Sequence, residues 1–284
     1  MTDFLTYYID NIQTLYEEVH TEIKDVLDGQ YPAKNKLNLI TKTVRNLISK
    51  GVDTGLEDDK PKRGSSRAVY LPKDKKPITL DGIKTSLPTA IKIAFHGVLD
   101  DDTGSDQLLG EHQNKHEADR MHLYHSIIKP DSNNNYTTNT DGVIAPILSY
   151  HPEHHWIEMP KVTDLKKSKF KELTKSKELP NGMDYDKFSK VIMNDYDMSL
   201  GKRPRYAKDS DHDKYIEHSL TSNVLHFAAD TDTHPGDISS LHNWGLFTHP
   251  ITGKEYPVIR DYGYSGEVAK LYHKARHSNR GVFD

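Results

Sequence analysis

Leu-His-Asn-Trp-Gly-Leu-Phe (residues 241–247) and Tyr-Pro-Val-Ile-Arg-Asp-Tyr-Gly-Tyr-Ser (residues 256–265) flank a short segment rich in turn formers. Residues 244–247 are short and apolar, and residues 249–254 carry the proline and glycine chemistry of a loop. Residues 256–259 include β-branched residues typical of a returning strand. The stretch therefore predicts a β-hairpin.

Two oxygen-bearing side chains stand at the open end of this hairpin. Asn243 precedes the first strand and Asp261 follows the second, where Gly263 lets the backbone turn sharply. Carboxylate and amide oxygens suit Mg²⁺, which takes one or two protein ligands and completes its shell with phosphate and water. The alternative is an ordinary turn with polar caps.

The composition is that of a polar, soluble chain. Of its 284 residues 35% are hydrophobic and 28% are charged, and the net charge is −4. No cysteine is present, which excludes disulfides and thiolate metal sites. No apolar run reaches the ~20 residues of a membrane helix, and no signal-peptide core is evident. We expect an intracellular, cytoplasmic protein.

The first half of the chain predicts helices followed by strands. Residues 3–27 and a second segment from about Lys36 carry helical apolar spacing, which predicts core packing or a partner surface. Residues 53–64 are a charged linker. Strands are expected at 66–71 and 88–95, separated by a polar loop at 73–86. Lys92 lies inside the second strand, so it is either an outward-pointing edge residue or a functional cation.

The second half predicts a hairpin and then mostly helices. A helix is expected at 108–128, a polar loop at 133–139, and a hairpin from strands at 143–150 and 156–159. Residues 166–177 form a basic helix or a solvated turn, and further helices are expected at 185–193 and 215–229. This order indicates a small β-rich lobe followed by a helical lobe, with a cleft between them.

Several short motifs resemble the protein-kinase family. Ala-Ile-Lys-Ile (residues 90–93) is similar to the strand whose lysine, here Lys92, pairs with the α- and β-phosphates of a nucleotide. Glu117, on the next expected helix, is similar to the glutamate that orients this lysine, with Glu111 as the alternative. Asn243 and Asp261-Tyr-Gly resemble the catalytic-loop asparagine and the Asp-Phe-Gly triplet, which hold Mg²⁺ in that family.

Two further segments fit the order of the same family. Gly64, Ser65 and Ser66 stand where the phosphate-covering loop belongs. Trp-Ile-Glu-Met-Pro (residues 156–160) resembles the last strand of the small lobe running into the hinge, where backbone groups meet adenine. The resemblance thus assigns Glu158 and Met159 to nucleotide binding. It spans residues 60–265, and the pairing of Asn-Trp-Gly with Asp-Tyr-Gly resembles kinase-like proteins of tailed bacteriophages.

The chain also departs from the family pattern. Gly64 is the single glycine where the phosphate-covering loop has three. The nearest counterpart of the catalytic base is Asp237 in His-Pro-Gly-Asp (residues 234–237), one position further from the asparagine than in the family. Asp237 is either that base, reached through a modified turn, or a helix N-cap. Few residues follow Gly263, so the resemblance lacks the helical subdomain that docks peptide substrates.

The resemblance implies an α+β, protein-kinase-like two-lobed fold. Its parts are an N-terminal helical extension (residues 1–52), a small β-rich N-lobe (residues 60–160) and a truncated, mainly helical C-lobe (residues 161–284). It implies an ATP- and Mg²⁺-binding phosphotransferase whose acceptor it does not name. The alternative is a catalytically impaired kinase-like module with a structural or interaction role, such as a phage virion or host-takeover component.

The expected partners are a nucleotide and, through the two N-terminal helices, a protein. We expect no membrane association. Nucleic-acid binding is not expected either, because residues 166–177 combine lysines with no arginine and one aromatic residue, Phe170. If the chain is phage-encoded, its location is the host cytoplasm or the virion.

Overall fold

The computed structural model describes residues 67–94, 105–120, 124–131, 135–152, 156–206 and 212–263, with separate positions at 39, 42–43, 56–57, 62–63, 154, 265–266 and 268. The strands are β1 (Lys62–Arg63), β2 (Arg67–Tyr70), β3 (Lys75–Leu80), β4 (Ile83–Ala94), β5 (Ile128–Pro130), β6 (Tyr136–Thr138), β7 (Ser149–Tyr150), β8 (Trp156–Pro160), β9 (Thr163–Asp164), β10 (Trp244–Thr248) and β11 (Glu255–Ile259). The helices are α4 (Ser105–Ala118), α5 (Lys167–Leu173), α6 (Tyr185–Ser199), α7 (His212–Ile216), α8 (Ser219–Thr231), α9 (Pro235–Ile238) and the 3₁₀ turn η1 (Leu241–Asn243). The described chain is therefore an α+β protein. The predicted N-terminal helices lie outside the described residues, apart from these separate positions.

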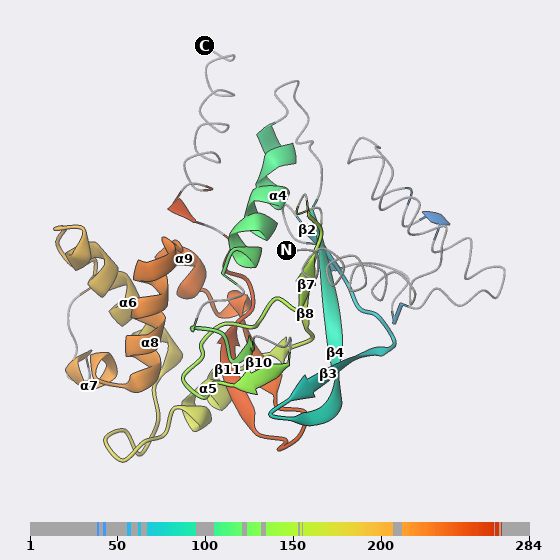
Figure 1. Ribbon diagram of the computed structural model, residues 1–284. Helices are drawn as coiled ribbons and strands as arrows, with labels where there is room; N and C mark the ends of the chain where they lie inside the picture. The colour runs from blue at the N-terminus through green and yellow to red at the C-terminus, as the bar shows by residue number, and fades with distance from the viewer. Residues whose placement is uncertain are drawn as a thin grey trace, which may run out of the picture.

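Strand β4 organises the larger sheet. Its residues 89–94 lie between β2 and β8, and its residues 83–88 pair with β3. Beyond these neighbours, β1 continues from β2, β7 from β8, and β6 and β5 from β3. The pairings are antiparallel except that of β3 with β6, so the sheet is mixed, and it curls around β4 (Figure 1).

The expectation of a polar loop at 73–86 is wrong, because this segment contains β3 and the start of β4. The two strands meet in a tight turn at Asp81 and Gly82, whose φ angles are 51° and 76°. Positive φ at both positions is what a type I′ hairpin turn requires, and Asp-Gly is its strongest sequence signal. The lysines and proline at the start of β3 hid the strand pattern.

The hairpin predicted from residues 244–259 is confirmed as β10 and β11, with Trp244 opposite Ile259. β9 adds a third strand beside β10. At the open end, Ile144 forms a parallel bridge with Ile259, and the backbone N–H of Ala145 donates to the Ile259 carbonyl at 2.9 Å. A segment that lies far earlier in the chain thus fixes the end of β11, two residues before Asp261.

Helices α6–α9 gather on the side of the molecule away from β2–β4 (Figure 1). Their core is an aromatic cluster in which Phe170 of α5 meets Tyr185 at 5.0 Å and Trp244 meets Phe188 at 5.7 Å, both edge-on. The basic segment therefore forms a helix rather than a solvated turn. The helix expected at 215–229 is two helices, because His218 caps α8 by accepting from the Leu220 N–H.

A second core lies between the larger sheet and the β10–β11 hairpin. Leu80, Ile127 and Ile157 are fully buried there, together with Phe247 and Val258 of the hairpin. Trp244 and Ile259 of the same hairpin belong to the helical core. The hairpin therefore joins the two cores, and its open end lies where they meet.

Four other boundaries differ from the expectation. The helix expected at 108–128 ends at Ala118, and Ile128 begins a strand. β6 lies within the loop expected at 133–139, and β1 within the linker expected at 53–64. The strand expected at 143–150 is regular only in β7; the preceding residues are buried irregular chain. No helix among the described residues is both long and apolar enough to cross a bilayer.

Candidate functional site

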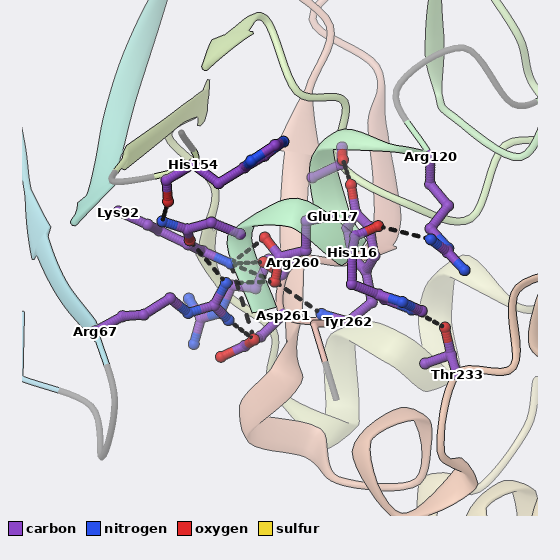
Figure 2. Close-up of polar contacts among 12 residues, drawn as sticks. Arg67, Lys92, His116, Glu117, Arg120, His154, Thr233, Arg260, Asp261 and Tyr262 are labelled. Atoms are coloured by element: carbon purple, nitrogen blue, oxygen red, sulfur yellow. Dashed lines mark hydrogen bonds and ion pairs between the residues drawn. The ribbon is translucent and has the colours of Figure 1, made fainter. Parts of the chain in front are cut away.

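Lys92 lies in the middle of β4 and is 6% exposed, so it is not an outward-pointing edge residue. Its ammonium donates to Glu117 Oε2 at 3.0 Å, to Glu117 Oε1 at 3.2 Å and to the carbonyl of Arg260 at 2.6 Å. It also lies 3.9 Å from Asp261 Oδ1. A buried lysine is stable only when its charge is paired, and these contacts supply the pairing (Figure 2).

Glu117 is completely buried on the last turns of α4. Besides Lys92, its carboxylate pairs with Arg67 Nη1 at 2.8 Å and accepts a hydrogen bond from the Tyr262 N–H at 3.3 Å. Asn114, one helical turn earlier on the same face, donates to the carbonyl of His154 at 2.8 Å and accepts from Arg67 at 3.3 Å. Of the two glutamates considered from the sequence, Glu117 is the one that meets Lys92.

Arg67 is the residue of this cluster that the sequence interpretation missed. Val69 of β2 lies opposite Lys92, and residues two apart in a strand share a face, so Arg67 points to the same side of the sheet as Lys92. Its guanidinium contacts Asn114, Glu117 and Asp261 (Figure 2). The reasoning that singled out Lys92, a cation inside a strand, applies equally to Arg67, but its position at the start of the strand concealed it.

Asp261 lies two residues after the end of β11 and faces both cations. Arg67 Nη2 donates to its Oδ1, and its own backbone N–H donates to the carbonyl of Asn243 at 3.3 Å. The Asp261 side chain is 44% exposed, whereas those of Arg67 and Lys92 are 6% and 8% exposed. Asp261 is therefore the open carboxylate of an otherwise buried cluster.

The protonation of the cluster follows from burial and from its opposite charges. Burial favours the neutral form of Lys92 and lowers its pKa, an effect that Glu117 opposes. Burial alone would raise the pKa of Asp261, but Arg67 and Lys92 outweigh it and lower the pKa to about 2. Burial would lower the pKa of Arg67, but Asp261 and Glu117 raise it above its usual value. Arg67 and Asp261 are accordingly charged at neutral pH.

Tyr262 and Gly263 hold the segment after Asp261 against α4. Tyr262 is fully buried, and its hydroxyl donates to the Ala145 carbonyl at 3.0 Å. A Cβ placed on Gly263 would come within 2.8 Å of the Gln113 Cβ and 3.0 Å of its carbonyl oxygen. Because real Cβ atoms do not approach so closely, only glycine lets this segment pack against the helix.

Asn243 lies beside Asp261 through a backbone contact, and Asp237 in turn contacts Asn243. The carbonyl of Asn243 accepts from the Arg260 N–H at 2.7 Å, and its side-chain amide donates to the Asp237 carbonyl at 3.1 Å. Asp237 stands in the first turn of α9, whose N-cap is His234. The alternative that Asp237 is the N-cap is therefore wrong. Its negative charge contributes, after those of Asp261 and Glu117, to raising the pKa of Arg67.

The residues expected to hold the rest of a nucleotide are less well placed. Glu158 lies opposite Ile91, the neighbour of Lys92, and so belongs to the other face of β4. It is buried, and its carboxylate accepts from Lys76 Nζ at 2.5 Å and Ser149 Oγ at 2.6 Å. Its carbonyl accepts from the Leu148 N–H. We therefore leave Glu158 out of the site.

Met159 lies on the Lys92 side of β4, opposite Ala90, and is buried in the core of the β-rich part. Gly64, Ser65 and Ser66 lie outside the described residues. Their expected contacts with a nucleotide stay predictions.

Asp261 and Asn243 are two side chains of this region that could offer oxygen ligands to a hard divalent cation. The amide NH₂ of Asn243 is engaged by Asp237, and no described hydrogen bond uses its amide oxygen. Among the described residues there is no group of three or more histidine or acidic side chains suited to a metal. Mg²⁺ does not need one, because it takes one or two protein oxygens and keeps waters and phosphate oxygens as its other ligands.

The fold and this cluster define an α+β protein with a buried lysine–glutamate pair beside an open aspartate. No protein-family model matches the chain, and a search of curated proteins finds no match.

Proposed function

We propose that this chain is a kinase-like protein that binds ATP with Mg²⁺ and transfers its terminal phosphoryl group. The supporting observation is that Lys92 of β4, Glu117 of α4 and Asp261 after β11 come from three separate segments and lie together in the fold. The lysine lies 3.0 Å from the glutamate and 3.9 Å from the aspartate. A metal–phosphate site requires a charged carboxylate that is open to solvent, and Asp261 supplies one beside the buried lysine–glutamate pair.

Each residue has a distinct part in this proposal. Lys92 binds the α- and β-phosphates, and Glu117 keeps its ammonium in position. Asp261 and Asn243 hold Mg²⁺, which neutralises the charge that develops on the phosphates. Because phosphoryl transfer depends mainly on positioning and charge stabilisation, Lys92 and Asp261 matter more than any base.

Asp237 is proposed to accept the proton of the attacking hydroxyl. Two features support this: its place within α9 rather than at the cap, and its backbone carbonyl, which accepts from the side-chain amide of Asn243. A carboxylate can take up the proton of a hydroxyl group during phosphoryl transfer.

A second candidate is a kinase-like module that binds a nucleotide or a partner without turnover. The contact of Arg67 with Asp261 favours it, because a cation already engages the proposed metal ligand. The phage virion or host-takeover role and a protein partner at the N-terminal helices belong to this candidate.

Calorimetric titration with ATP·Mg²⁺ tests nucleotide binding. Asp261→Ala is expected to weaken binding by about tenfold or more, which corresponds to ~1.4 kcal/mol. The matched control is Asp186→Ala, which removes an exposed aspartate paired with Lys167 on the surface. Equal affinity of the wild type and Asp261→Ala would refute the site.

Incubation with γ-labelled ATP and Mg²⁺ separates the two candidates. Label transfer or hydrolysis that is lost in Lys92→Ala supports the phosphotransferase. Binding of ATP·Mg²⁺ without any turnover supports the module.

A further inference from the structure

Arg67 is a charged member of the cluster that the proposed function does not use. It begins β2, and 6% of its side chain is exposed. Its Nη1 lies 2.8 Å from Glu117 Oε1 and donates to Asn114 Oδ1 at 3.3 Å, while its Nη2 donates to Asp261 Oδ1. One guanidinium therefore connects helix α4 to Asp261, two residues beyond the end of β11 (Figure 2).

The contact with Asp261 has an electrostatic consequence for metal binding. Oδ1, the oxygen that Arg67 contacts, also lies 3.9 Å from the ammonium of Lys92. A divalent cation at this carboxylate lies within a few ångström of two positive charges that buried partners hold in place. Like charges at such a separation repel strongly in a protein interior, where the effective dielectric constant is well below that of water.

We propose that Arg67 is a resident counter-cation of Asp261 that competes with divalent metal for this carboxylate, so that free metal binds weakly. The inference rests on the proposed function, in which Asp261 is a metal ligand. Arg67 thereby favours metal that arrives together with an anion, such as the polyphosphate of a nucleotide, over free metal.

The contacts of the guanidinium allow it to release Asp261 while it stays bound to the rest of the cluster. Its Nη1 contacts go to Glu117 and Asn114, both fully buried on α4, whereas its Nη2 contact goes to the open side, where Asp261 is 44% exposed. Breaking the Nη2 contact leaves the Nη1 contacts in place. The freed N–H groups then become available on the open side, where the proposed function puts the nucleotide phosphates. Arginine binds phosphate oxygens in a fork geometry.

Titration of the full chain with Mn²⁺ alone, followed by the electron paramagnetic resonance signal of the free ion, tests the competition. Arg67→Met is expected to tighten Mn²⁺ binding by about tenfold or more, because it removes a unit charge a few ångström from the metal. Arg67→Lys keeps the charge and is expected to stay within about threefold of the wild type. An Arg67→Met protein that binds Mn²⁺ no more tightly than the wild type overturns the proposal.

Two further variants separate the competition from a folding defect and from a general change of charge. Arg67→Gln can still donate to Glu117 through its amide, so it replaces Arg67→Met if that protein does not fold, with the same expected direction. Arg120→Met is the matched control, because it removes a half-buried arginine that donates to the carbonyls of His116 and Thr231. Equal tightening in Arg120→Met would indicate a general charge effect and would also overturn the proposal.

The result is separable from the test of nucleotide binding. In the double variant Arg67→Met/Asp261→Asn, the gain in Mn²⁺ affinity is expected to disappear. A wild type that fails to bind ATP·Mg²⁺ while Arg67→Met shows this gain refutes the proposed function and leaves the competition standing. If the wild type binds ATP·Mg²⁺ and Arg67→Met leaves the Mn²⁺ affinity unchanged, the competition is refuted and the proposed function stands.

Discussion

Two lysine–glutamate pairs lie on opposite faces of the sheet around β4, and they differ in one respect. Lys76 and Glu158 meet at 2.5 Å, with Ser149 completing the contacts of the carboxylate. Lys92 and Glu117 meet at 3.0 Å, but Arg67 and Asp261 join them, and Asp261 is 44% exposed. The first pair is closed, and the second is a four-charge cluster with one open carboxylate.

The comparison shows which feature distinguishes a structural ion pair from a candidate functional site: a charged group that is open to solvent. A buried charge pair with every partner satisfied stabilises or specifies the fold. Asp261 also balances the charge of Arg67, but unlike Glu117 and Glu158 it is partly exposed, so it can meet a ligand from solvent as well. The sequence interpretation assigned Glu158 to nucleotide binding and Glu117 to the orientation of Lys92, and the comparison retains Glu117 alone.

The largest expected effect comes from removing the charge of each glutamate. Glu117→Gln leaves Lys92 and Arg67 buried with a single carboxylate, so we expect a loss of about 3–5 kcal/mol in the free energy of unfolding. Glu158→Gln leaves Lys76, whose side chain is 14% exposed, and is expected to cost about 1–2 kcal/mol. Chemical denaturation measures both, and equal costs would break the comparison.

The lysines offer the corresponding contrast in binding. Lys92→Met is expected to reduce affinity for ATP·Mg²⁺ by about tenfold or more, because it removes the phosphate-binding cation, whereas Lys76→Met leaves affinity unchanged. Calorimetric titration of the two variants decides the matter. A similar loss in both would mean that the other face of β4 also contributes to the site.

A pH-dependent prediction concerns His116, the neighbour of Glu117 on α4. Burial and Arg120 lower the pKa of His116 to about 3 from the usual 6.5, so the unfolded chain takes up a proton between these values that the folded chain does not. The free energy of unfolding should therefore fall as the pH drops from about 6.5 towards 3, by up to about 1.4 kcal/mol per pH unit from this group.

His116→Gln isolates this contribution, because the other histidines remain and the difference between the two pH profiles belongs to His116 alone. Denaturation midpoints across this pH range supply the measurement. Parallel profiles for the variant and the wild type would exclude a buried neutral His116.

Asp261 contributes to stability over a lower pH range. Its stabilisation is present above pH 3.8 and is lost as the pH falls towards 2.

The smallest effect is expected on the exposed face of the same helix. Lys115 and Asp119 form an ion pair at 2.6 Å, but their side chains are 54% and 47% exposed. Exposed i,i+4 pairs contribute little because water and salt screen them. Lys115→Gln is expected to change the free energy of unfolding by less than about 0.5 kcal/mol. A loss as large as that of Glu158→Gln would show that exposure does not distinguish the pairs.

Local patterns in the sequence predicted several elements correctly. Turn formers between apolar segments predicted the β10–β11 hairpin, and apolar spacing predicted α6. A lysine inside a buried strand marked Lys92 as a residue that needs a partner. The Asp81-Gly82 turn was equally readable, but the polar start of β3 hid it.

The sequence by itself determined the hairpin and the presence of Asp261 at its open end, since strand pattern, turn residues and the position of Asp261 are local features. Strand register and helix placement were decided only in the tertiary structure. The register of β4 puts Glu158 on one face and Lys92 on the other, and the pairing of β2 with β4 brings Arg67 to Lys92. Those contacts join residues far apart in the chain, so their energy depends on how whole elements pack and not on any local pattern.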